Sequence, residues 1–149
     1  MSVEENKALV RRLNDEVFNT GNVALMHELM MEDYVAHSPA VAEGIGSTTQ
    51  GLQAVEQEMA FFRTVFSDVH IVIEDMLGEG DNVAVRGFTR GRHTGEIYGV
   101  RPSGNQVTLS WSAIYRIANG KIAERWLNSD DLNSYQQLGL IPPQQQRTG

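Results

Sequence analysis

Apolar and polar positions follow two different periods along this chain. Residues 3–20, 23–31 and 51–66 place apolar side chains three or four positions apart, which predicts three amphipathic helices. From residue 69 onward the period changes to two, as in strands, and glycine-containing turns separate the alternating runs. Short connections of this kind join antiparallel neighbours. We therefore expect an α+β domain in which a meander of about four antiparallel strands curls over the helices.

The segments between and after these elements are expected to be irregular. Residues 34–50 leave the second helix and form a loop rich in Gly, Ser and Thr. Residues 132–138 form a short helical turn that Gly139 closes. The polar tail, 144–149, is expected to be disordered. A chain of 149 residues is long enough for one well-buried core, so residues 1–143 are interpreted as a single domain.

The stretch 107–131 is predicted to be a β-hairpin. Asn119 and Gly120 join two alternating runs, and this dipeptide suits a type I′ turn because both central positions need positive φ. Counting outward from the turn pairs Tyr115 with Glu124, and the same count sorts every side chain onto one of two faces. One face then holds a set of large or polar side chains: Trp111, Tyr115, Glu124, Trp126, Asn128 and Asp130.

This face is interpreted as the wall of a cavity. It gathers both tryptophans of the chain with three polar groups, and a buried carboxylate is costly unless it is paired or acts as an acid or base. In a second interpretation, Asp130 lies in water at the end of the strand and caps the segment that follows. A β-bulge would shift the pairing by one residue and exchange the two faces.

The composition of the chain limits which binding partners and which cellular compartment are expected. The formal net charge is -7, and nonspecific binding to nucleic acid needs clustered Lys and Arg, so no nucleic-acid partner is expected. The chain contains no cysteine, which excludes disulfides and thiolate metal sites. Acidic residues near the start replace the basic and apolar run of a secretory signal, and no stretch has the apolar length of a membrane span. We expect a soluble cytoplasmic protein with no membrane partner.

Two motifs carry a resemblance to a known family. The first is the run G-x-H-x-G-x-x-x-G-x-x-P-[ST]-G at residues 91–104. The second is Gly-Lys-Ile-x-Glu-x-Trp at residues 120–126, with Asp130 four residues after the tryptophan. With the helical start NKALVRRLNDEVFNTGN and the final QLGLIP, the chain resembles the SnoaL-like polyketide cyclase or ester cyclase family of the NTF2-like superfamily over nearly its whole length.

The resemblance implies a fold and a chemistry. The fold is an NTF2-like cone, in which a curved antiparallel sheet wraps around N-terminal helices and encloses an apolar cavity. The chemistry is an aldol-type ring closure, or a related proton abstraction, on a small apolar cyclic or polyketide-like molecule, without metal or cofactor. The residue matching Asp130 would be the base, and such a base works best with a pKa raised toward neutrality. Departures from the family pattern at Arg101, Asn128 and Ser129 leave the substrate open.

Further side chains are candidates for the same site. His37, where the second helix ends, is interpreted as a donor to the substrate or as a loop histidine bonded to backbone. His93 shares its parity with the inward-facing apolar residues of its strand, and Phe62 could line the pocket from the third helix. No closely spaced metal-binding motif is present. The predicted site residues are Asp130, His37 and His93 for catalysis, and Trp111, Tyr115, Trp126, Asn128, Glu124 and Phe62 for substrate binding.

The other face of the hairpin is a candidate for self-association. It carries Ile114 and Leu127 among small polar side chains, which predicts self-association unless the face is simply solvated. The family resemblance implies that the assembly is a homodimer or homotetramer. Two alternatives to catalysis stay open at this point. The chain could be a binding protein that holds an apolar ligand without transforming it, or a scaffold whose sheet face serves assembly.

Overall fold

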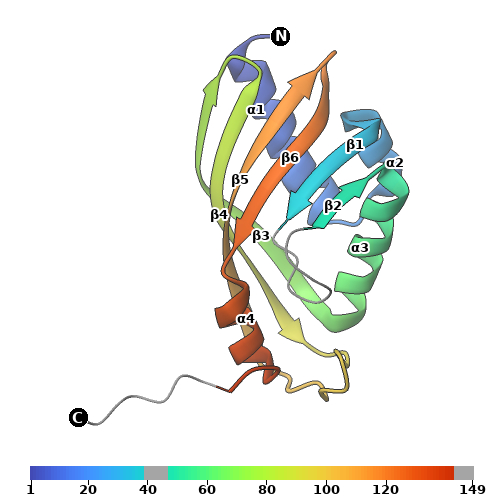
Figure 1. The fold of residues 1–149 in the computed structure, drawn as a ribbon, viewed down its shortest axis with the longest axis vertical. Helices are drawn as coiled ribbons and strands as arrows, with labels where there is room; N and C mark the ends of the chain where they lie inside the picture. The colour runs from blue at the N-terminus through green and yellow to red at the C-terminus, as the bar shows by residue number, and fades with distance from the viewer. Residues whose placement is uncertain (39–46, 143–149) are drawn as a thin grey trace, which may run out of the picture.

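The computed structural model describes residues 1–38 and 47–142, which form helices packed on one side of a curved sheet (Figure 1). In chain order the elements are α1 (Val3–Arg12), η1 (Leu13–Phe18, a π-helical continuation of α1), α2 (Val23–Leu29), β1 (Met30–Ser38), β2 (Ser47–Gln50), α3 (Leu52–Val65), β3 (Phe66–Glu79), β4 (Asn82–His93), β5 (Gln106–Ala118), β6 (Lys121–Ser129) and α4 (Asp131–Leu138). The expected α+β cone, with a curved sheet around N-terminal helices, is confirmed.

The sheet has six strands in the order β2-β1-β6-β5-β4-β3. Strands β3 to β6 form the predicted antiparallel meander. The predicted total of about four strands is wrong, because β1 joins β6 in parallel and β2 pairs antiparallel with β1. Parallel strands from distant segments are not joined by a short turn, so the local sequence pattern did not predict this pairing.

Part of the predicted loop 34–50 is therefore strand. Residues up to Ser38 lie in β1, and β2 begins at Ser47. The remainder of that loop, 39–46, and the tail, 144–149, lie outside the described residues.

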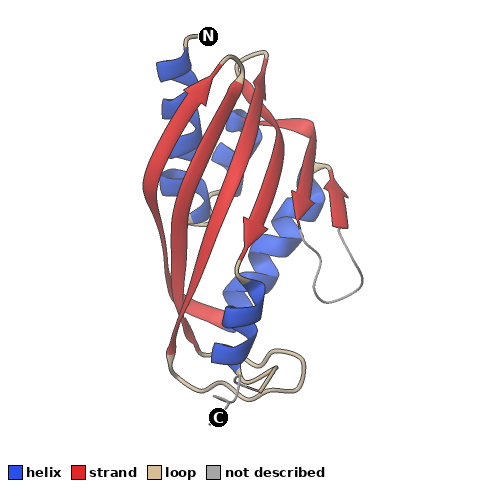
Figure 2. Cartoon of the chain, turned by 60° about the vertical axis from the view of Figure 1, so that its left-hand side comes forward, coloured by secondary structure: helices blue, strands red, loops and turns tan. Residues whose placement is uncertain are grey.

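The helices that precede β3 cover the concave face of the sheet, whereas α4 follows the end of β6 and lies beside β5. Figure 2 shows the N-terminal helices behind the strands, with the opposite face of the upper sheet uncovered. Side chain oxygens cap two of these helices, since Ser2 accepts a hydrogen bond from the Glu5 N–H and Asn22 accepts one from the Leu25 N–H, each at 3.1 Å. The main core lies between the helices and the concave face, where Val10, Leu13 and other apolar side chains meet the inward residues of the strands.

The turn of the last hairpin agrees with the sequence, but its register does not. Asn119 and Gly120 have positive φ angles of 51° and 73°. Two residues further, Ile117 pairs with Ile122 while Arg116 pairs with Glu124, which leaves Ala123 as an extra residue in β6. This β-bulge shifts the pairing by one residue, so the register predicted for the rest of the hairpin is wrong.

The bulge exchanges the faces of β6. Tyr115 pairs with Arg125, and Ala113 pairs with Leu127, so these two β6 side chains share the inner face with the inward residues of β5. Leu127, which was expected on the outer face beside Ile114, therefore lies inside. Three residues that were predicted on the inner face lie instead on the outer face: Glu124, Trp126 and Asn128.

The close packing of β4 against β3 predicts the effect of one substitution. A Cβ at Gly87 would overlap the carbonyl oxygen of Val72 and lie 3.2 Å from the Trp111 ring. We expect Gly87→Ala to lower the free energy of unfolding by about 1–3 kcal/mol, as overpacking usually does. Urea unfolding measures this change, with Ser112→Ala on the exposed face as a control that stays within about 0.5 kcal/mol of wild type. Equal stability of Gly87→Ala and wild type would contradict this packing.

Candidate active site

An inner cavity lies between the concave face of the sheet and the helices. It consists of two adjoining hollows with volumes of about 230 and 120 Å³. Side chains of α3 line the larger hollow, and side chains of β5 line the smaller one. The residues common to both are Phe18, Ile71, Thr89, Arg125 and Leu127. The walls are mostly apolar with a few polar groups, which is typical of sites for small molecules.

Arg125 brings a positive charge into this cavity. The bulge at Ala123 turns its side chain inward, and Arg125 lines both hollows. Its Nε atom is buried and has no hydrogen-bond partner in residues 1–38 and 47–142. Burial disfavours the charged guanidinium, but attraction to Tyr34, Tyr115 and Glu58 outweighs burial, so the pKa of Arg125 lies above its ordinary value. The cavity therefore holds a permanent cation.

Tyr34 adds a buried phenol to the same wall. It comes from β1, is only 1% exposed, and lines the larger hollow. Its hydroxyl has no partner among the side chains and backbone that the structure describes. Burial raises the pKa of Tyr34, and the opposing effect of Arg125 is smaller, so the phenol is neutral at physiological pH. An unpaired buried hydroxyl costs about 1–3 kcal/mol, which an acceptor on a ligand would offset.

Other polar contacts fix the cavity wall. The indole Nε1 of Trp111 donates to the hydroxyl of Thr89 at 3.0 Å, which holds the ring against β4. Glu58 comes from α3 and is the only carboxylate among the described residues that line the two hollows. It is exposed, and its Oε1 accepts a hydrogen bond from the Thr49 hydroxyl at 3.2 Å. The cavity thus combines the inward-facing Arg125 and a neutral phenol with an exposed carboxylate and an exposed guanidinium, those of Glu58 and Arg63.

Three of the predicted substrate-binding residues line this cavity. Trp111 and Tyr115 face the smaller hollow, and Phe62 faces the larger one. The prediction that both tryptophans share one wall is wrong, because Trp111 is 8% exposed inside while Trp126 is 39% exposed on the outer face. The one-residue register shift is the physical reason for this difference.

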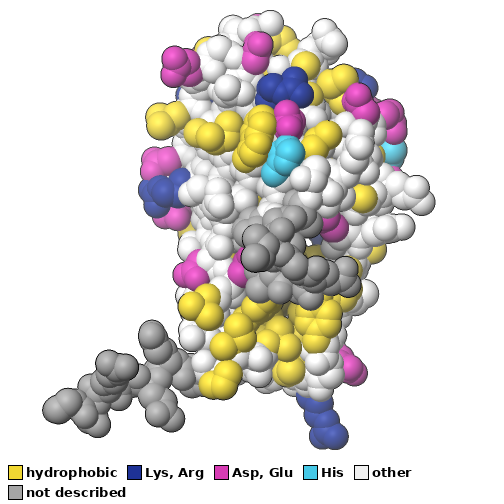
Figure 3. Space-filling view, viewed as in Figure 1, with side chains coloured by type: hydrophobic (Ala, Val, Ile, Leu, Met, Phe, Trp, Pro, Cys, Tyr) yellow, Lys and Arg dark blue, Asp and Glu magenta, His cyan; other side chains and the backbone are white. Residues whose placement is uncertain are grey.

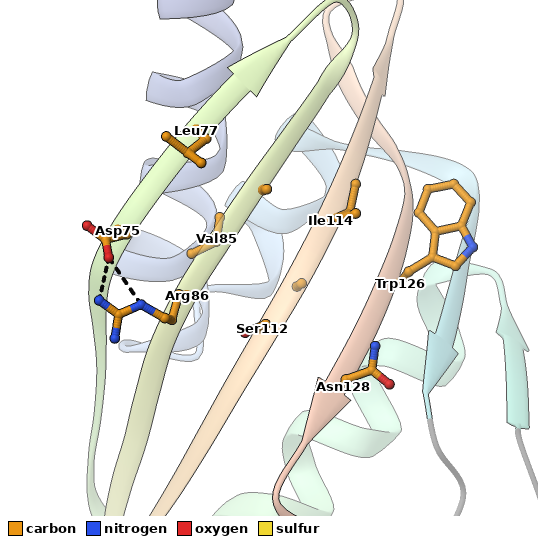
Figure 4. Close-up of a pocket in the computed structure, with 10 residues that line it drawn as sticks. Asp75, Leu77, Val85, Arg86, Ser112, Ile114, Trp126 and Asn128 are labelled. Atoms are coloured by element: carbon orange, nitrogen blue, oxygen red, sulfur yellow. Dashed lines mark hydrogen bonds and ion pairs between the residues drawn. The ribbon is translucent and has the colours of Figure 1, made fainter.

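The other three, Glu124, Trp126 and Asn128, lie on the opposite face of the sheet. Trp126 and Asn128 line a broad groove of about 620 Å³ on this uncovered face (Figure 4). Figure 4 shows Ile114, Trp126 and Asn128 projecting from neighbouring strands on this side, with Arg86 paired to Asp75 at its edge. Although this groove is larger than the inner cavity, its lining contains no buried side-chain atom without a hydrogen-bond partner among the described residues. The inner cavity is therefore the stronger candidate site.

His37 belongs to this outer face as well. Its Nε2 lies 2.6 Å from a carboxylate oxygen of Glu124, and its ring stacks on Trp126 with centroids 5.3 Å apart. Arg116 donates to the other oxygen of Glu124 at 3.0 Å. The hydrogen bond from His37, assisted by Arg116, lowers the pKa of Glu124. Figure 3 shows a histidine beside acidic, basic and hydrophobic side chains on this surface.

His93 is buried at the far end of β4. It is 0% exposed, which agrees with the inward orientation predicted from strand parity. Its Nδ1 accepts a hydrogen bond from the Ser103 N–H at 3.2 Å, and the ring lies beside Phe66. Its Nε2 has no partner within the described part of the chain, but His93 does not line either hollow. Its catalytic role stays a prediction.

Asp130 lies at the start of α4 and acts as its N-cap. The side chain is exposed and accepts a hydrogen bond from the Asn133 N–H at 3.2 Å. The geometry corresponds to the second interpretation of this residue, in which it caps the following segment. Asp130 is absent from the lining of both hollows, although its neighbour Ser129 lines the smaller one. A role as base stays a prediction that needs experiment.

Sequence reasoning missed the three polar groups that the cavity brings together. Arg125 was placed on the opposite face, Tyr34 in a loop, and Glu58 was passed over. One signal for Arg125 was available, since the adjacent apolar residues Ile122 and Ala123 interrupt the alternation of β6, and both are buried. Such a break is typical of a bulge.

The described residues give two further negative findings. No group of three or more His, Cys, Asp or Glu side chains among them is placed to hold a metal ion. None of their helices has the length and apolar character that a membrane crossing requires.

Comparison with known proteins defines the family. The sequence model of the SnoaL-like polyketide cyclase family matches residues 8–138. This chain therefore belongs to the SnoaL-like polyketide cyclase family. No curated protein matches it.

Solved structures agree with this assignment. Wild-type IdmH from Streptomyces antibioticus, described as "a putative polyketide cyclase", is 30% identical with a TM-score of 0.79, over 90% of this chain and 98% of that chain. A "putative SnoaL-like polyketide cyclase" from Jannaschia sp. CCS1 is 24% identical with a TM-score of 0.80, over 93% and 94% of the two chains. AclR from Streptomyces galilaeus, described as "a putative hydroxylase", is 23% identical with a TM-score of 0.82, over 97% and 87%. The last two show the fold alone.

The positions of the two tryptophans predict how the protein reports a ligand. A planar apolar ketone such as 9-fluorenone should enter the inner cavity and quench Trp111 but not Trp126. Fluorescence titration of the Trp126→Phe variant, which keeps Trp111, should therefore show saturable quenching. The matched Trp111→Phe variant should show only weak, unsaturable quenching. Saturable quenching confined to Trp126 would place the binding site on the outer face instead.

Proposed function

We propose that this protein is a cofactor-independent, cyclase-type enzyme whose inner cavity binds a small, mainly apolar, polyketide-like molecule and promotes proton abstraction next to a carbonyl group. The observation that carries this proposal is the pair of donors without a partner among the described residues, the Nε of Arg125 and the hydroxyl of Tyr34, on the wall of a mostly apolar cavity. Membership of the SnoaL-like family supports the same class of reaction.

The donors suit the charge that develops in such a reaction. Removal of a proton alpha to a carbonyl places negative charge on the carbonyl oxygen, and preorganised donors in a dry site stabilise that charge strongly. Burial keeps Tyr34 protonated, so its hydroxyl can donate to the enolate oxygen. Arg125 adds a full positive charge nearby. The enolate could then attack a second carbonyl of the same molecule and close a ring.

Two carboxylates are candidates for the base. Asp130 occupies the position that the family resemblance favours, whereas Glu58 lines the larger hollow. The proposed proton donors are His37 and His93, neither of which lines the inner hollows. We propose to assign the base by substitution, since loss of a general base typically lowers the rate about 10²–10⁴-fold.

Deuterium exchange tests the enzyme proposal before the natural substrate is known. The protein should accelerate incorporation of deuterium from D₂O at the acidic carbon of aryl β-keto esters, followed by NMR. We expect Tyr34→Phe to lower this rate by about 10²-fold, because it removes one oxyanion donor. Tyr98→Phe is the control, since Tyr98 is exposed and does not line the cavity. Among Asp130→Asn and Glu58→Gln, the variant that loses exchange identifies the base.

Two outcomes would contradict the proposal. Exchange by Tyr34→Phe at the wild-type rate would remove the cavity as the site of chemistry. Binding without any exchange by the wild-type protein would favour the alternative function, a binding protein for small molecules. The capping position of Asp130, away from the cavity lining, is the observation that favours this alternative.

We also propose that two copies associate through the uncovered face of the sheet. Leu77, Ile114 and Trp126 are exposed there around the outer groove, and apolar side chains gathered in this way often mark an interface. Two such faces can pack with two-fold symmetry.

Light scattering measures this association. The wild-type protein should have the mass of a dimer or tetramer at micromolar concentration, and Ile114→Glu should shift it toward the monomer. Leu132→Glu changes another exposed leucine, on α4 and away from the groove, and should leave the mass unchanged. A monomeric wild-type protein would refute the interface.

A further inference from the structure

We propose that the inner cavity selects an organic acid: a ligand whose carboxylate binds Arg125 and Tyr34 while its apolar body fills the rest of the cavity. This inference rests on the proposed function, in which the inner cavity is the substrate site. It adds that the ligand carries a negative charge.

The first argument is that Arg125 has no counterion among the described residues. No carboxylate oxygen of these residues lies within 4.0 Å of its guanidinium, although eight other pairs of charged or ionisable side chains meet that distance. Glu58, the carboxylate that lines the same hollow, attracts Arg125 only from beyond ion-pair distance and bonds to Thr49. Arg125 is partly exposed with a buried Nε, and among the described residues it therefore lacks the ion pair that usually accompanies an arginine in a protein interior.

The second argument is the position of the free donors. The Nε of Arg125 and the hydroxyl of Tyr34 are both buried and unpartnered among the described residues, and both side chains line the larger hollow. An arginine presents its N–H groups in a planar fork that matches the two oxygens of a carboxylate. A carboxylate on the fork could also accept from the phenol of Tyr34, which burial keeps protonated.

The third argument separates an anion from a neutral carbonyl. A ketone or ester oxygen would satisfy a donor, but it would leave Arg125 with only the longer-range attraction of Glu58 as a counter-charge. The remaining lining of the larger hollow is largely apolar: Phe18, Val55, Met59, Phe62, Val69, Ile71 and Leu127. Charges in such surroundings interact strongly because little solvent screens them. An anionic ligand therefore gains more from this site than its neutral analogue.

A matched pair of ligands tests the inference directly. 2-Naphthoate and methyl 2-naphthoate share one ring system and differ mainly in charge at neutral pH. Each is titrated into the protein while the indole N–H resonance of Trp111, inside the cavity, and that of Trp126, outside, are followed by NMR. The wild-type protein should bind the acid at least about tenfold more tightly than the ester, with the larger shift at Trp111, because hydrogen bonds to charged partners are stronger.

Arginine variants connect the preference to Arg125. Arg125→Met should bring the two affinities to within about twofold, and it should remain folded because an apolar side chain of similar length often replaces a buried charge without loss of stability. Arg125→Lys keeps the charge without the fork and should retain part of the preference. Arg86→Met removes an outer-face arginine and should leave the preference unchanged. Circular dichroism confirms that each variant is folded.

The outcomes separate this inference from the proposed enzyme activity, since binding is measured without turnover. Equal binding of acid and ester by the wild-type protein, binding of neither at millimolar concentration, or a preference that survives in Arg125→Met would each overturn the inference. Deuterium exchange on neutral esters with no preference for acids would keep the enzyme proposal and reject this one. An Arg125-dependent preference for the acid without any deuterium exchange would keep this inference and reject the enzyme proposal.

Discussion

The position of a single extra residue in β6 determines which side chains meet inside this protein. Side chains of a strand alternate between its faces, so the bulge at Ala123 exchanges the faces of every residue that follows it. Arg125 turns into the cavity and Trp126 turns out to the uncovered sheet face. Before the bulge, Ile122 is fully buried in the main core. The part of β6 before the bulge therefore contributes to the core. The part after the bulge supplies side chains to both the inner cavity and the outer face of the sheet.

The sequence predicted features whose physical cause is local. Asn119 and Gly120 specified their turn because few other residues accept positive φ at both positions, and the stripe on residues 51–66 specified α3. The buried orientation of His93 followed from regular alternation in β4. The bulge and the parallel pairing of β1 with β6 depend instead on contacts between distant segments, and these decided where Arg125 and Tyr34 lie. The fold was therefore more predictable than its site.

The charge of Arg125 inside the cavity has a free-energy cost that the surrounding fold must offset. A fully buried guanidinium carries a desolvation cost of several kcal/mol, and the partly exposed Arg125, whose Nε is buried, carries a fraction of that cost. Here the cost is reduced by attraction to the oxygens of Tyr34, Tyr115 and Glu58 rather than by a closed ion pair. The apolar side chains of η1, α3 and β3 around it contribute burial that offsets the remainder. Such a site is preorganised, because its donors are held in place before any ligand binds.

The capping role of Asp130 places a physical condition on its use as a base. To reach a ligand in the cavity, the carboxylate would have to leave the Asn133 N–H, because Asp130 lines neither hollow while its neighbour Ser129 lines the smaller one. Loss of an N-cap typically costs about 1 kcal/mol, which ligand binding can offset. Ser129 also donates to Asp131 at 2.7 Å, so the polar contacts at the start of α4 would rearrange together. Catalysis by Asp130 would therefore be coupled to the first turn of α4, whereas catalysis by Glu58, which already lines the larger hollow, would leave that helix unchanged.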